Sequence, residues 1–148
     1  MTPSPRVLRW NLAAAILLVL TQAGLGIVVN LYVTVPSHHS GAHPANYFNG
    51  SLHSLGWALA HGAAMLTVHA ALGLAVVVLA VYLAVTAWRY GRAAIGGWCG
   101  LGGLFVIGAG FNGASFLDFN NNISSLLMAL LAFAAIACYT VALTLSTA

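Results

Sequence analysis

Long apolar stretches, rather than an alternation of apolar and polar residues, dominate this chain, and its polar residues collect between them. Four of the stretches reach the roughly 20 residues that a helix needs to cross the hydrocarbon core of a bilayer. They lie at 10–33, within 51–88, at 93–111 and at 123–145. The pattern predicts an all-α membrane protein in which residues 1–148 form a single domain, a bundle of four transmembrane helices.

The second stretch is longer than one span needs. A single helix over 51–88 would measure about 57 Å at about 1.5 Å per residue, whereas the hydrocarbon core is about 30 Å thick. Counting back from Arg89, the span begins near residues 61–66. The preceding segment contains Trp57 and reaches Gly62, a residue that favours a bend. We therefore expect a short interfacial helix before the second span.

The arginines predict the topology. Arg6 and Arg9 precede the first stretch, and Arg89 and Arg92 lie between the second and third. The other two connections, 34–50 and 112–122, contain no arginine or lysine. Under the positive-inside rule both termini are cytoplasmic (N-in, C-in), and these two loops are on the outer side.

Composition narrows the possible functions. The chain is 61% hydrophobic and 3% charged, so it has too much apolar surface for a soluble domain. It has no lysine for a Schiff base, and its single acid, Asp118, cannot form a pair of catalytic carboxylates. It also lacks the basic stripe of a nucleic-acid-binding protein. Cys99 and Cys138 fall within apolar stretches, where we expect them to pack as small hydrophobic residues.

Three histidines, His53, His61 and His69, follow one another in steps of eight residues. On an α-helix such a step rises about 12 Å and turns about 80°, so the three do not share one face. His69 is the informative one because it falls inside the second span. An imidazole in that position is costly unless it pairs with a neighbour, binds a metal or faces a cavity.

Three interpretations of His69 remain open. In the first, the ring is neutral and is hydrogen-bonded to a hydroxyl or a backbone carbonyl of a neighbouring helix. In the second, His69 binds a metal other than haem iron. In the third, His69, or alternatively His61, ligates haem b in a pocket of the bundle. Five-coordinate iron needs no further ligand. A sixth ligand would be Met128, a loop histidine, or His61 across a dimer interface.

The haem interpretation predicts a b-type cytochrome-like membrane protein or electron-transfer subunit. No residue is assigned a catalytic role, and the sequence leaves open whether the protein is an enzyme.

The two outer loops suggest another kind of site. If they come together, their imidazoles and carboxylate would form a zinc or copper site on the outer face. The residues concerned are His38, His39, His43, His53 and Asp118.

The third stretch, "IGGWCGLGGLFVIGAGFNG", is rich in glycine. A helix of this kind packs closely against another helix or leaves room for a planar cofactor. It therefore supports an alternative function, that of a non-catalytic accessory subunit. Such a subunit would join a homo-oligomer or a larger membrane complex through this helix.

Three blocks of sequence carry a resemblance to known proteins: "GAHPANYFNGSLHSLGWALAHG", "HAALGLAVVV" and "GAGFNGASFLDFNNNISSLLMA". They resemble a group of small four-span bacterial membrane proteins, largely actinobacterial and uncharacterised. The likeness covers most of 24–140 and includes Asn46, His61, His69 and Asn112. It implies the four-span topology and location in a bacterial plasma membrane, and it implies no activity.

The segment "TQAGLGIVV" at 21–29 is similar to a membrane segment in one half of haem A synthase. This similarity implies a four-helix haem-binding bundle in which His61 or His69 is the ligand. The synthase carries paired ligand histidines on two helices and an acidic residue before one of them. Neither feature has a counterpart in this chain, so synthase activity is not implied.

Overall fold

A computed structural model describes residues 4–89 and 92–147. Within them the chain forms α1 (Pro5–Tyr32), α2 (Tyr47–His61), α3 (Ala64–Arg89), α4 (Ala93–Phe119) and α5 (Asn122–Leu145). The helices α1, α3, α4 and α5 are long and apolar enough to cross a membrane. The predicted all-α bundle of four spans is confirmed.

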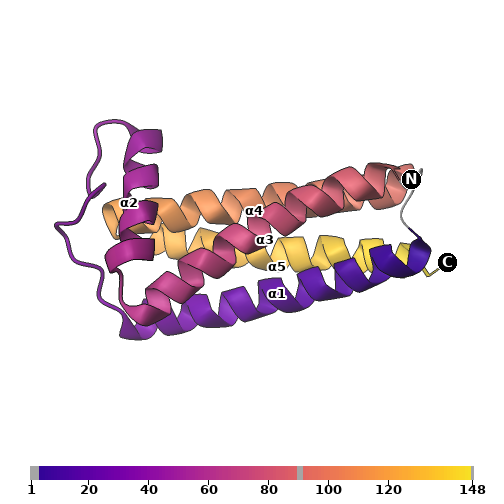
Figure 1. The fold of residues 1–148 in the computed structure, drawn as a ribbon, viewed down its shortest axis with the longest axis horizontal. Helices are drawn as coiled ribbons and strands as arrows, with labels where there is room; N and C mark the ends of the chain where they lie inside the picture. Colours follow the sequence, from indigo (N-terminus) through magenta and orange to yellow (C-terminus); the bar gives the residue numbers. More distant parts are fainter. Residues whose placement is uncertain (1–3, 90–91, 148) are drawn as a thin grey trace.

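The four long helices pack side by side as a ring. α3 contacts α1 and α4, and α5 contacts α4 and α1, whereas the backbones of the diagonal pairs, α1–α4 and α3–α5, do not approach closely in the described residues. α2 lies across one end of the bundle and contacts α3 and α4 (Figure 1). The start of α1 and the end of α5, next to the two termini, lie at the opposite end.

The separate helix before the second span is also confirmed. α2 ends at His61, and α3 begins at Ala64, within the range predicted for the start of the span. The turn between α2 and α3 requires a glycine at Gly62, because a Cβ there would collide with the Ala58 carbonyl oxygen. The Thr67 hydroxyl donates to that same carbonyl at 2.9 Å and fixes α2 against the first turn of α3.

Two clusters of buried residues hold the bundle together. The larger one fills the end near the termini and includes residues from all four long helices: Leu8, Leu12, Leu83, Ile95 and Tyr139. The smaller one lies under α2 and comprises Val29, Val35, Ala58, Leu66 and Leu117. Cys99 and Cys138 are buried free cysteines, as expected.

Glycines of α4 allow very close contacts inside the bundle. A Cβ at Gly102 would lie 2.7 Å from the ring of Tyr139 on α5, and one at Gly103 would lie 3.5 Å from the Ala80 carbonyl oxygen on α3. A Cβ at Gly97, in contrast, would meet nothing within 4 Å. The close helix packing predicted for this segment is therefore made within the chain.

The prediction for the end of the third stretch is wrong. We expected a span over 93–111 followed by a loop, but α4 continues to Phe119. Asn112 does not break it, because its side-chain amide donates to the Gly108 carbonyl of the same helix at 2.9 Å. The helix ends at Asn120, which is left-handed with φ 48°. Asp118 consequently lies in the last turn of α4, buried, and not in an exposed loop.

The arginines gather at the end of the bundle that holds the termini. Arg6 and Arg9 lie in the first turns of α1, Arg89 ends α3 and Arg92 precedes α4. Exposed tryptophans accompany them, as at a membrane–water interface: Trp10, Trp88 and Trp98. The cytoplasmic orientation of this end stays a prediction of the positive-inside rule.

The glycine contacts generate a first prediction. Replacing Gly102 by alanine forces the buried Tyr139 ring to move, and we expect a loss of about 1–3 kcal/mol of unfolding free energy, as for other overpacked cores. The same change at Gly97 enters open space, where alanine should be neutral or stabilise the helix by up to about 1 kcal/mol.

Thermal unfolding of the two variants in detergent, followed by tryptophan fluorescence, compares them directly. Gly102→Ala should melt below the wild type and Gly97→Ala should not. Equal melting temperatures for the two variants would contradict the packing described for α4.

Candidate functional site

A pocket of about 550 Å³ lies in the half of the bundle that faces α2. All five helices contribute to its wall, and it separates the two buried clusters. Its volume falls in the range of roughly 300–1,000 Å³ that is typical of small-molecule sites. Ile27, Leu74 and Phe111 line the pocket and are also exposed on the outside of the bundle. The pocket therefore opens sideways between the helices, toward lipid when the bundle is in a bilayer.

Small side chains explain why this half of the bundle is hollow. The backbones of the diagonal helices lie apart, and many of the residues that face the space between them are too short to fill it. These small residues of the wall come from all four long helices: Ala23, Gly26, Ala70, Gly73, Gly110, Gly113, Ala114 and Ala129. The glycine-rich sequence of α4 thus gives both close packing at one end and space at the other.

His69 on α3 supplies the ionisable side chain of the pocket wall. Its Nε2 lies 3.4 Å from Nε2 of Gln22 on α1, and the same Gln22 amide donates to the His69 carbonyl oxygen at 3.0 Å. His69 Nδ1 and Gln22 Oε1 are both buried and have no partner in the structure. Buried polar atoms are nearly always paired, so this incomplete pair is typical of a binding site.

Two glycines make the contact between Gln22 and His69 sterically feasible. A Cβ at Gly26 would lie 3.1 Å from Cε1 of His69, so the edge of the imidazole rests on the backbone of α1. A Cβ at Gly73 would lie 3.0 Å from Gln22 Nε2. Gln22 was not among the site residues predicted from the sequence. The signal was available, since Gln22 is an amide in the middle of an apolar span.

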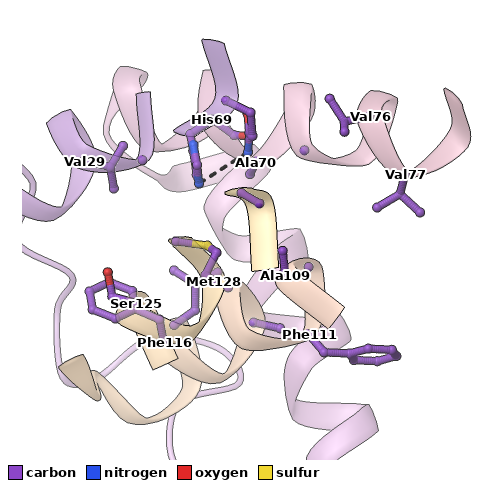
Figure 2. A pocket seen from close by; sticks show the side chains of 18 of the residues that line it. Val29, His69, Ala70, Val76, Val77, Ala109, Phe111, Phe116, Ser125 and Met128 are labelled. Atoms are coloured by element: carbon purple, nitrogen blue, oxygen red, sulfur yellow. Dashed lines mark hydrogen bonds between the residues drawn. The ribbon is translucent and has the colours of Figure 1, made fainter. Parts of the chain in front are cut away.

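Met128 on α5 lines the same pocket as His69. Figure 2 shows the two side chains entering this space from opposite walls. Gly113 of α4 makes room for the thioether, because a Cβ there would lie 3.2 Å from Sδ. His61, in contrast, is the exposed last residue of α2 and is not part of the pocket wall. The structure therefore brings together two of the three predicted haem ligands.

Two of the histidines predicted to bind zinc or copper pack against aromatic rings. The ring of His39 stacks on Trp57 with centroids 4.3 Å apart, and its Nε2 lies 3.1 Å from the Leu117 carbonyl oxygen. The ring of His43 packs edge-on against Phe119.

In residues 4–89 and 92–147 no three His, Cys, Asp or Glu side chains are close enough to share a metal ion. The structure does not assemble the set predicted for the outer face: His38, His39, His43, His53 and Asp118.

α2 closes one end of the pocket and is held there by hydrogen bonds to the last turns of α4. The Tyr47 hydroxyl donates to the Phe111 carbonyl oxygen at 2.9 Å and accepts from the Ser115 hydroxyl at 2.9 Å. The Ser51 hydroxyl donates to Oδ2 of Asp118 at 2.8 Å. Because Ser51 also lines the pocket, α2 is part of the site.

The docking of α2 generates a second prediction. Tyr47→Phe removes both hydrogen bonds of the hydroxyl, at about 1–2 kcal/mol in total, and backbone amides of α2 should then exchange about 5–30-fold faster. Hydrogen–deuterium exchange of the detergent-solubilised protein measures this directly. Tyr32→Phe, at an exposed residue with no side-chain hydrogen bond in the structure, is the matched control and should leave the exchange of α2 unchanged. Unchanged exchange in both variants would show that the Tyr47 hydroxyl does not hold α2.

Comparisons with known proteins add no further residues to this site. No protein-family model matches the chain, no curated protein is significantly similar to it, and no solved structure matches its fold at a significant level.

Proposed function

We propose that this protein binds haem b inside the membrane, with His69 and Met128 as axial ligands, and that it serves as a small cytochrome-like electron-transfer protein. One observation carries the proposal: a histidine of α3 and a methionine of α5, two diagonal helices of the ring, point into one apolar pocket. Imidazole and thioether are the ligand pair of several cytochromes, and together they raise the reduction potential of haem iron.

The contacts of His69 are compatible with this role. At 3.4 Å the contact between Gln22 Nε2 and His69 Nε2 exceeds the usual length of a hydrogen bond, so Nε2 is weakly engaged. Gln22 also donates to the His69 carbonyl oxygen at 3.0 Å, and this bond survives when Nε2 takes another partner. A proton on Nδ1 leaves the Nε2 lone pair available for a metal.

The wall of the pocket suits a flat and largely apolar group. Its glycines and alanines present backbone rather than bulky side chains, and no Asp, Glu, Lys or Arg contributes to it. The acid groups of haem would face the polar rim, where Ser125 donates to the side-chain oxygen of the exposed Asn30 at 3.2 Å. Haem would supply one-electron exchange, and the chain would supply ligation and exclusion of water.

A second candidate is an uncharged lipid that carries a carbonyl group, such as an isoprenoid quinone. The absence of a cationic side chain from the pocket wall favours it, since nothing there pairs with a negatively charged ligand. The His69–Gln22 pair would donate hydrogen bonds to the carbonyl oxygen. The sideways opening would let the tail extend into the bilayer.

The haem proposal generates a third prediction. Protein purified in detergent from haem-replete cells should show a Soret band that shifts when dithionite is added. His69→Ala should abolish the band. Met128→Leu should retain it but yield a five-coordinate reduced form that binds carbon monoxide.

Matched controls are available for both variants. His61→Ala and Met65→Leu change exposed residues outside the pocket and should leave the spectrum unchanged. A featureless spectrum, before and after addition of haem to folded protein, would rule out haem. The second candidate then predicts a quinone in organic extracts of the wild type that is depleted in extracts of His69→Leu.

A further inference from the structure

Asp118 is the only acidic residue of the chain, and it is buried where a negative charge is unfavourable. Its side chain is 1% exposed, in the last turn of α4. The carboxyl end of a helix carries the negative pole of the helix dipole. Burial and the dipole therefore both call for a compensating positive charge.

The oxygen atoms around Asp118 are incompletely paired. Oδ2 accepts a hydrogen bond from Ser51 at 2.8 Å, whereas Oδ1 has no partner. Ser54 lies one turn further along α2, is 0% exposed, and its hydroxyl also has no partner. Residues three apart lie on the same face of a helix, so both serines face the bundle.

One loop covers this group of side chains. The backbone N–H of His43 donates to the Asp118 carbonyl oxygen at 2.9 Å. Two residues earlier, Gly41 lies so close to Ser54 that a Cβ would collide with its hydroxyl. The loop thus packs directly against Ser54 of α2 and is hydrogen-bonded to the last turn of α4.

The chain itself offers this carboxylate no cationic partner in the described residues. Arg92 lies at the other end of α4, about 39 Å away at about 1.5 Å per residue, and the other arginines lie at that same end. The nearby imidazoles face other groups: Nε2 of His39 faces the Leu117 carbonyl oxygen, and the ring of His43 faces Phe119. His53 of α2 is exposed.

We propose that Asp118, Ser51 and Ser54 bind one small monovalent cation, Na⁺, at the end of α4. The donor set contains only oxygen, which favours a hard cation over zinc or copper. A single carboxylate balances a single positive charge. In membrane transporters the carboxyl ends of broken helices are a recurrent place for Na⁺. The site does not depend on which ligand occupies the neighbouring pocket, although Ser51 belongs to both.

Thermal unfolding of the detergent-purified full chain tests the proposal. Sodium chloride is compared with choline chloride at equal ionic strength and at several pH values. The melting temperature of the wild type should rise in a saturable manner with Na⁺ and not with choline. Ser54→Ala should require about tenfold or more Na⁺ for the same rise, and Asp118→Asn should abolish the response.

Two further measurements keep the test decisive. Ser124→Ala removes a buried serine from α5 and should respond to Na⁺ as the wild type does. If Asp118→Asn does not fold, binding of radiolabelled Na⁺ to wild type and Ser54→Ala replaces it, with a weaker signal expected for the variant. Equal melting in Na⁺ and choline at every pH, together with no bound label, would overturn the proposal.

Discussion

Inside a bilayer the hydrophobic effect does not draw helices together, so this bundle depends on close contacts at positions where a helix presents its backbone. α4 provides those contacts. Gly102 and Gly103 bring it against the ring of Tyr139 and the backbone of Ala80, and these contacts fix α4 between α3 and α5. Because α4 also forms one wall of the pocket, this packing positions the pocket residues that α4 contributes.

The same helices enclose a pocket at the other end, where small side chains face each other across the diagonals of the ring. A space of this size in a bundle has to be filled by lipid, ligand or another side chain. α2 closes its end through hydrogen bonds to α4 from Tyr47 and Ser51. One half of the bundle is thus closely packed, and the other half encloses the pocket. The polar groups of this half are Ser51, where the pocket meets α2, and the Gln22–His69 pair, where α1 meets α3.

Much of the fold could be predicted from the sequence, because the lengths of the apolar stretches and the positions of the arginines mark where the spans begin and end. The four spans, the short helix before the second span and the bend at Gly62 all follow from the length of a bilayer crossing. The end of α4 could not be predicted in this way. Asn112, Gly113 and Asn120 favour a turn locally, but packing of the last turns against α2 keeps the first two of them helical.

The site was only partly predictable. A histidine within a span pointed to His69, and a thioether on the fourth span pointed to Met128. Gln22 was missed because its role depends on how α1 and α3 align, which no local pattern specifies. The outer-loop histidines were misleading for the opposite reason. His39 and His43 look like metal ligands in the sequence, yet the ring of His39 stacks on Trp57 and that of His43 packs edge-on against Phe119.

If the space around His69 is a binding site, the protein should leave the membrane with its ligand in place. Native mass spectrometry of the protein, released from its own membranes in mild detergent, measures this. We expect the wild type to carry a non-covalent ligand with the mass of haem b or of a quinone, and His69→Leu of unchanged helix content to lack it. If neither protein carries a ligand, or if both carry the same bulk phospholipids, the space is no binding site and His69 is a packing residue.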